Sequence, residues 1–304
     1  MHLILRRVVI AIPTLMLLSL VVFLLLELAP GDAASAILDV SATAEQEAEL
    51  RTELGLDQHV LVRYLRYLNG VLQGDFGVSA RSGMSVAHEI GVRLPYTITL
   101  IAAAMLIATV FGIGLGFLSA VKHHSIWDTG ITVVVSLGMA LPTFWIALIL
   151  VQIFAVELGW LPVFGADSPQ HLILPAFCTA FVLIPGIARI TRVSLLEAFN
   201  ADFIMFAQAK GIHTRQIITR HISPIAAISI VTYIGLQIVR LITSVAVMEV
   251  IFNYPGLGGL AVSAAFDRDF MMLQGVTLTI AVLTFSVLFI VDLIVAYLDP
   301  RIKL

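Results

Sequence analysis

Residues 97–121 read TITLIAAAMLIATVFGIGLGFLSAV, a stretch without a single charged side chain. A helix rises about 1.5 Å per residue, so a run of this length can cross the ~30 Å hydrocarbon core of a bilayer. A helix also satisfies its own backbone hydrogen bonds, which lipid cannot do. We therefore expect this stretch to be a membrane-spanning helix.

Similar apolar runs lie on both sides of this stretch. They occupy residues 8–28, 129–157, 172–190, 225–250 and 275–298. The 304-residue chain is 60% hydrophobic and 12% charged, whereas a soluble protein carries about 25% charged residues. The net charge of −3 gives no indication of a nucleic-acid partner. The sequence therefore predicts an all-α, polytopic membrane protein of about six transmembrane helices.

The first run, residues 8–28, follows Arg6 and Arg7 and has two interpretations. It is longer than the apolar core of a usual signal peptide, and the following Ala29-Pro30-Gly31-Asp32 is a poor cleavage site. We expect residues 1–28 to be a retained first transmembrane helix, with a cleaved signal peptide as the alternative.

Basic residues near the ends of the runs predict the orientation. With the N-terminus in the cytoplasm, Arg268 is the only basic residue in the short external connections. The cytoplasmic side then holds Arg6, Arg7, Lys122, Arg189, Arg192, Lys210, Arg215, Arg220, Arg301 and Lys303. We therefore expect both termini to be cytoplasmic.

Residues 29–96 form a long polar connection that we expect to be an external helical loop. Thr43 and Gln46 make a capping-box pattern ahead of a predicted helix over 44–54. A second amphipathic helix is predicted by the helical spacing of Leu61, Tyr64, Leu65, Leu68 and Leu72. The loop could form a cap on the external face, or its helix could lie in the lipid interface. Residues 97–304 then make a five-helix core.

The connection between the fourth and fifth runs predicts a short cytoplasmic helix within residues 194–224. Asn200 is a good N-cap residue, and Asp202 suits the positive end of a helix dipole. Lys210 suits the last turn, and Gly211 can stop the helix with a positive φ. Pro224 can then open the next membrane helix. An exposed helix of this kind is suited to docking into a groove of another protein, and a plain turn is the alternative.

The fifth apolar run contains two ionisable residues, Arg240 and Glu249. A charge facing lipid is costly, so we expect these side chains to line a pore or a subunit interface. The following segment combines aromatic residues with turn residues, which favours a gate at the outer mouth of a pore or an ordinary external turn. Its candidate gate residues are Phe252, Tyr254, Pro255, Gly256, Leu257 and Gly258.

The sequence has no pattern of a catalytic or metal site. It lacks a Walker A sequence, His-Glu-x-x-His and Gly-x-Ser-x-Gly. His123-His124 has no third ligand nearby, and the lone cysteine, Cys178, lies in an apolar run. We therefore expect a non-catalytic chain that binds no cofactor or metal ion.

Several short motifs occur in an order and spacing that are highly specific when taken together. They are Ala29-Pro30-Gly31-Asp32, Leu54-Gly55-Leu56-Asp57, Gly74-Asp75-Phe76-Gly77-Val78-Ser79, Arg93-Leu94-Pro95-Tyr96-Thr97, Pro142-Thr143-Phe144-Trp145, Phe252-Asn253-Tyr254-Pro255-Gly256-Leu257-Gly258, Val291-Asp292-Leu293 and Leu298-Asp299-Pro300-Arg301. Over essentially its whole length the chain resembles the membrane permeases of the dipeptide, oligopeptide and nickel ABC importers.

This resemblance implies a role for the 194–224 connection. In the family, an Ala-rich helix, a Gly and a Pro thirteen residues later form the motif that couples the permease to its ATPase. Gly211 and Pro224 fit that spacing and Ala207 fits the motif's Ala, whereas Met205 and Phe206 depart from it. The expected coupling residues are Asp202, Phe206, Ala207, Lys210, Gly211 and Pro224.

The resemblance also implies an assembly in the bacterial inner membrane. A second, related permease subunit would complete the pathway, two ATP-binding subunits would carry ATP and Mg²⁺, and an extracytoplasmic binding protein would deliver the substrate. Expected substrates are di- or oligopeptides, including modified peptides such as glutathione. Nickel complexes, opines or sugars are alternatives for the same transporter type. A secondary transporter or a channel is the alternative from another class.

Overall fold

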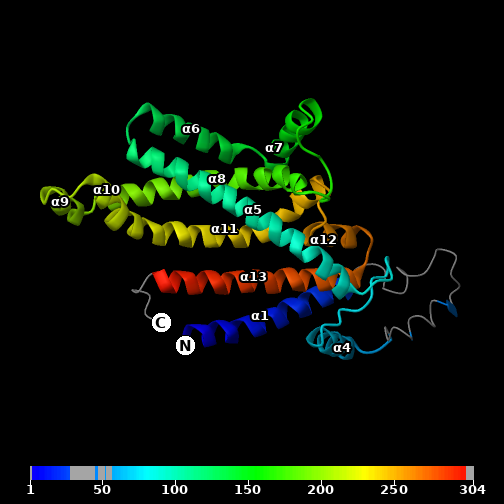
Figure 1. Cartoon of the computed structure of the whole chain (residues 1–304). Helices are drawn as coiled ribbons and strands as arrows, with labels where there is room; N and C mark the ends of the chain where they lie inside the picture. The colour runs from blue at the N-terminus through cyan, green and yellow to red at the C-terminus, as the bar shows by residue number, and fades with distance from the viewer. Residues whose placement is uncertain (1, 28–44, 47–51, 53–56, 299–304) are drawn as a thin grey trace. The chain divides into compact units, whose positions relative to one another are not determined.

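A computed structural model describes residues 2–27, 45–46, 52 and 57–298 of the chain. Helices dominate these ranges, and an isolated antiparallel bridge joins Val78 to Ser85. The α-helices are α1 (His2–Glu27), α4 (Val60–Leu72), α5 (Val86–Val121), α6 (Ile126–Ala140), α7 (Thr143–Leu150), α8 (Ile173–Phe199), α9 (Asp202–Ala209), α10 (Thr214–Ile217), α11 (Ser223–Ile251), α12 (Leu257–Phe266) and α13 (Phe270–Leu298) (Figure 1). Two π-helical segments, η1 (Val151–Glu157) and η3 (Ile218–Ile222), and a 3-10 helix, η2 (Pro169–Leu172), complete the set.

Within the described residues, four helical stretches are long and apolar enough to cross a membrane. They are Val86–Val121, Pro169–Phe199, Arg215–Ile242 and Phe270–Tyr297. A fifth is reached if the bent pair Ile126–Ala140 and Thr143–Glu157 counts as one span, and α1 adds the shorter apolar segment Val9–Leu25. The prediction of an all-α, polytopic membrane protein is confirmed.

The third predicted span, 129–157, is not one continuous helix. It breaks between α6 and α7, and the two parts are bent by 103°. The break lies at Leu141 and Pro142, where Leu141 has an extended conformation with φ −86° and ψ 133°. The ring of a proline disfavours a helical conformation for the residue before it, so Pro142 accounts for the end of α6. The prediction of one continuous membrane helix over 129–157 is therefore wrong.

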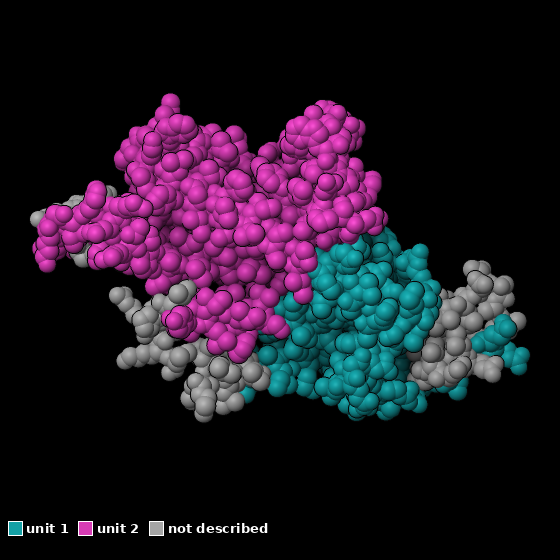
Figure 2. Space-filling model, viewed as in Figure 1, with its two compact units in different colours: residues 1–97, 255–285 teal, residues 98–254, 286–304 magenta. Residues whose placement is uncertain are grey.

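The chain divides into two compact units, residues 1–97 with 255–285, and residues 98–254 with 286–304 (Figure 2). In the first unit, a buried core joins the start of α5 to α12 and α13. Its members are Val86, Ile90, Leu257, Ala264, Met272 and Val276. A buried hydrogen bond from the Ser79 hydroxyl to Asp269 fastens the segment before α5 to the start of α13.

Helix α4 of the same unit confirms the amphipathic helix that the leucine and tyrosine spacing predicts. Tyr64 is buried, and its ring meets Phe23 of α1 edge-on at 5.5 Å. The Tyr64 hydroxyl also lies 2.9 Å from the hydroxyl of Ser19. The tyrosine face of α4 therefore packs on α1, while Leu61 and Leu65 remain exposed. The other helix predicted in this loop, over 44–54, lies mostly outside the described residues.

The second unit is built around α8, which packs against α6, α7 and α11. Helix α5 approaches α8 closely at two glycines, one turn apart. A β-carbon at Gly112 would lie 2.7 Å from Ile187, and one at Gly116 would lie 2.4 Å from the backbone oxygen of Ala188. Small residues four apart let two membrane helices approach until their backbones nearly touch.

Candidate functional site

In the predicted coupling loop, residues 194–224, one face of α9 packs on the second unit. Ile204 and Ala207, one turn apart, both point into a buried cluster. The other members of that cluster are Ala120, Leu195, Ala198, Ile217, Ile222, Ala226 and Ile230, from α5, α8, α10, η3 and α11. The apolar face thus fixes the place of α9 at this end of the helices.

The opposite face of α9 is open. The Phe206 side chain is 72% exposed, and Asp202 and Lys210 are exposed as well. An aromatic side chain flanked by an acid and a base offers both apolar area and charge to a partner. Of the predicted coupling residues, α9 holds Asp202, Phe206 and Ala207, with Ala207 on its buried face and Phe206 exposed. Lys210 and Gly211 follow the end of this helix, and Pro224 lies in α11.

Gly211 ends this helix as the sequence predicts. Its φ is +74°, a region that L side chains rarely adopt. Just beyond it, the amide of Ile212 donates to the carbonyl of Ala207 at 3.2 Å. This six-residue closure is the hydrogen bond of a Schellman motif, in which glycine favours the left-handed position.

The start of α9 differs from the prediction. Asn200 does not cap it; instead it closes α8, with φ −88° and its amide donating to the carbonyl of Leu196. Helix α8 continues to Phe199, beyond the end of its apolar run, and α9 follows after a sharp turn. Asp202 does lie in the first turn of α9, where the helix dipole favours an acid.

Pro224 lies in the first turn of α11. The preceding segment η3 is π-helical, and the amide of Ser223 donates to the carbonyl of Ile218, five residues back. A proline ring would collide with the carbonyl four residues before it in a regular helix. The wider π turn accommodates the ring, so α10, η3 and α11 follow one another without a break.

A part-buried ion pair lies at the same end of the second unit. Arg192 of α8 donates through Nε and Nη2 to the two carboxylate oxygens of Asp128, at 2.8 and 2.9 Å. The hydroxyl of Ser119 on α5 and the amide of His124 also donate to this carboxylate. His123 Nδ1 lies 3.2 Å from it. Asp128 thus binds α5, α6 and α8 together.

This ion pair adjoins the coupling loop through the chain itself. Ala120 and Leu195 belong to the buried cluster that packs on α9. Ser119 directly precedes Ala120, and Arg192 lies one turn before Leu195. The sequence patterns do not predict this network. A signal was present in Ser125-x-x-Asp128, a helix-start pattern in which the Ser125 hydroxyl accepts the amide of Asp128.

The two candidate pore residues lie on α11, Arg240 a little past its middle and Glu249 in its last turn. Glu249 is 1% exposed, whereas Arg240 is exposed. The two therefore occupy different environments on one helix. An exposed arginine in an apolar span can face a pore, a partner subunit or lipid. Facing lipid has the highest free-energy cost of the three.

The candidate gate begins as a tight, buried turn. The amide of Tyr254 donates to the carbonyl of Glu249 at 2.8 Å, and the amide of Gly165 donates to the carbonyl of Phe252 at 3.1 Å. Phe252 and Tyr254 are buried, and Asn253 between them has a φ of +44°. These hydrogen bonds tie the end of α11 to the connection between η1 and η2.

The remaining gate residues belong to the first unit. Gly256 precedes α12 in an extended conformation, and Pro255 is partly buried. Leu257 is fully buried, and its amide donates to the hydroxyl of Thr97 at 2.8 Å. Gly258 is also buried. The segment is therefore packed and hydrogen-bonded, with Asn253 as an exposed point.

The coupling residues and the pore and gate candidates do not form one site. The coupling residues precede or begin α11 and the gate residues follow its end, with the pore candidates between them, and its 29 residues give it a length of about 44 Å. Within the described residues, no cluster of three or more His, Cys, Asp or Glu side chains could hold a metal ion. The geometry is that of a helical scaffold with a short, partly exposed helix, α9, at one end.

Comparison with known proteins gives consistent results along the chain. Residues 112–304 match the family model of the binding-protein-dependent transport system inner membrane component, and residues 1–101 match that of its N-terminal region. The oligopeptide transport system permease protein AppB of Bacillus subtilis is 36% identical, covering 99% of this chain and 98% of its own. The glutathione transport system permease protein GsiC of Salmonella paratyphi A is 38% identical over the same shares.

Solved structures share the fold. A chain of the MetNI methionine ABC transporter in an inward-facing conformation superposes with a TM-score of 0.59 at 18% identity. The match covers 69% of this chain and 96% of that one. A chain of an amino acid ABC transporter gives a TM-score of 0.53 at 15% identity, covering 70% of this chain and 94% of its own.

Proposed function

The chain belongs to the family of inner membrane components of binding-protein-dependent transport systems, and we propose that it forms half of the translocation pathway of an ATP-driven peptide importer. As a member of this family it is a non-catalytic, membrane-embedded permease subunit that works with an ATPase and a substrate-binding protein. In the proposed assembly, a second, related permease completes the pathway and two ATP-binding subunits carry ATP and Mg²⁺.

The observation that supports the proposal is that α9 has one buried face and one exposed face. One face of this helix, with Ile204 and Ala207, is buried in the second unit, and the other face presents Phe206. Because the buried face of α9 packs against α8 and α11, a displacement of α9 by a partner bound at Phe206 would be passed to these membrane helices. The ATP-binding subunit would receive this exposed face in a groove.

The proposed orientation places both termini and α9 in the cytoplasm. Lys122, Arg192, Lys210, Arg215 and Arg220 then share the cytoplasmic side, as the positive-inside rule requires. The connection from Phe252 to Gly258 comes to the external side, where it would close the pathway and meet the binding protein. Arg240 would face the pathway or the second permease.

The proposed substrates are di- or oligopeptides, or a modified peptide such as glutathione. Support comes from the two relatives that match this chain over nearly their whole length, an oligopeptide permease and a glutathione permease. Arg240 fits this choice, because a guanidinium can bind a peptide carboxylate or carbonyl.

Reconstitution tests this function. The chain is purified with its companion permease and ATP-binding subunits, placed in liposomes and supplied with the binding protein and labelled glutathione or a labelled oligopeptide. We expect uptake that needs both ATP and the binding protein, and competition by other peptides. Competition by a nickel complex, an opine or a sugar instead would overturn the substrate class. Uptake by this chain alone without ATP would indicate a secondary transporter or a channel.

A further inference from the structure

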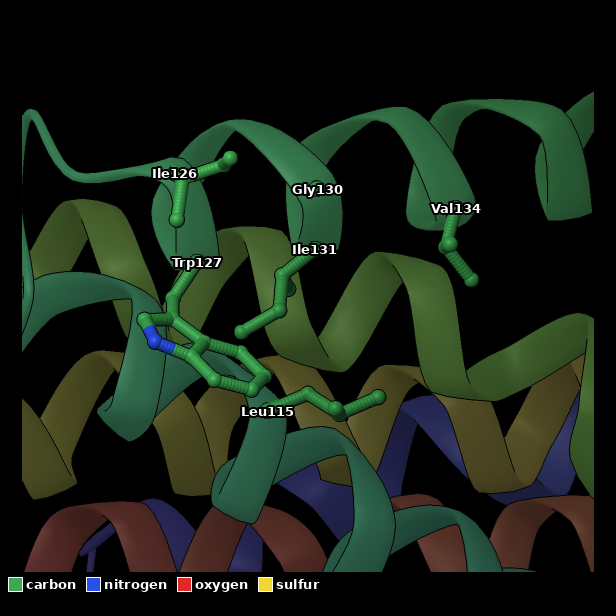
Figure 3. A pocket seen from close by; sticks show the side chains of 6 residues that line it. All are labelled: Leu115, Ile126, Trp127, Gly130, Ile131 and Val134. Carbon is green, nitrogen blue, oxygen red and sulfur yellow. The ribbon is translucent and has the colours of Figure 1, made fainter.

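A groove with apolar walls opens on the second unit beside the turn that joins α5 to α6. It has a volume of about 480 Å³ and is lined by Leu115, Ile126, Trp127, Gly130, Ile131 and Val134. The Trp127 ring reaches from α6 toward Leu115 of α5, and Ile131 and Val134 follow along α6 (Figure 3). The groove thus runs from the end of the helix pair toward the interior of the span.

The dimensions of this groove suit an acyl chain. Val134 lies eight residues beyond Ile126, which corresponds to about 12 Å along the helix axis. Gly130 leaves the middle of the groove open, since a β-carbon built there meets no atom within 4 Å. Ile126 and Trp127 remain exposed at the entrance. Tryptophan is a common side chain at the level of lipid headgroups.

A positive charge stands at the entrance. The ammonium of Lys122 lies 6.0 Å from the centre of the Trp127 ring, over its face. The nearby carboxylate of Asp128 is occupied by Arg192, Ser119 and the amide of His124. Among the described residues no carboxylate lies within ion-pair distance of Lys122. The Lys122 charge is therefore available to an anion outside the protein.

We propose that this groove binds an anionic phospholipid, with the headgroup phosphate at Lys122 and one acyl chain along Trp127, Gly130 and Val134. The apolar walls and the charge at one end match the two parts of such a lipid. A zwitterionic lipid fits the walls equally well but has a weaker net attraction to Lys122. The groove is lined by residues of α5 and α6 and by none of α9, and the proposal does not depend on the transported substrate.

Quenching of Trp127 fluorescence tests the proposal in the assembled transporter. The complex is reconstituted with lipids brominated on their acyl chains, either phosphatidylglycerol or phosphatidylcholine at the same mole fraction. The signal of a Trp127→Phe complex is subtracted, so the difference reports on Trp127. We expect phosphatidylglycerol to quench about fivefold more effectively, the preference that one basic residue near an anionic surface gives.

Two variants should remove this preference, and two controls should keep it. Lys122→Gln removes the charge, and Gly130→Leu places a side chain in the groove at a position where the β-carbon meets no atom within 4 Å. The controls are Gly114→Leu, also at an open position, and Arg220→Gln, an exposed cation outside the groove. Equal quenching by both lipids in the unaltered complex would overturn the proposal. So would quenching by neither lipid, since a protein partner would then cover the groove.

Discussion

At position 211 the backbone has a φ of +74°, and a β-carbon added there would meet no atom within 4 Å. Strain in the backbone, not crowding, therefore decides which side chains this position accepts. Asparagine tolerates the left-handed region better than other non-glycine residues, and β-branched residues tolerate it least. Comparing an asparagine variant with a valine variant therefore distinguishes an effect of backbone conformation from an effect of side-chain size.

We predict that Gly211→Val lowers transport and that Gly211→Asn largely preserves it. Valine at this φ costs about 1–3 kcal/mol locally, which displaces Lys210 and the turn beyond it. The measurement is ATP hydrolysis stimulated by the loaded binding protein, in complexes matched for membrane insertion. Normal stimulation in the valine variant would mean that the helix stop has no part in coupling.

The Asp128–Arg192 pair gives a prediction about stability. Arg192→Gln removes the bidentate partner of a carboxylate whose side chain is 7% exposed. Breaking a fully buried pair costs about 3–5 kcal/mol, and the 29% exposure of Arg192 reduces this to about 1–3 kcal/mol. We expect a lower unfolding midpoint in detergent. Arg189→Gln, at an exposed position on the same helix, is the control and should match the unaltered chain.

At the scale of elements, the contact between α5 and α8 depends on two glycines whose α-hydrogens face a neighbour. We predict that Gly116→Ala destabilises the protein by about 1–3 kcal/mol, because the new methyl group would meet the backbone oxygen of Ala188. Gly114→Ala is the matched control, since nothing lies within 4 Å of its β-carbon. Thermal unfolding of the two purified variants makes the comparison, and equal midpoints would contradict the close packing.

The elements also show what the sequence could predict. Helix α4 and the helix end at Gly211 can be predicted from residues close together in the sequence, and the structure contains both. The break at Pro142 was missed because hydropathy averages over the proline and does not register the backbone it imposes on Leu141. The Asp128–Arg192 pair joins residues 64 apart in the chain, so spacing within one helix could not reveal it.

At the scale of the whole molecule, the membrane class and the family could be predicted from apolar runs and ordered motifs. The environment of the gate residues could not. The glycines and aromatic residues after α11 suggested a loop, yet Phe252 and Leu257 are fully buried. Their burial depends on partners distant in the sequence, such as Gly165 and Thr97, each within its own unit.

The central claim is that the exposed face of α9 docks on the ATP-binding subunit. The most direct measurement places a photoreactive phenylalanine analogue at position 206 and irradiates the assembled transporter in its membrane. Position 266 is the control, because Phe266 is also a highly exposed phenylalanine, at 85% against 72% for Phe206, in the connection assigned to the external side. We predict a cross-link to the ATP-binding subunit from position 206 and none from position 266. A complex that hydrolyses ATP but gives no such cross-link at 206, or equal cross-links from both positions, would contradict the claim.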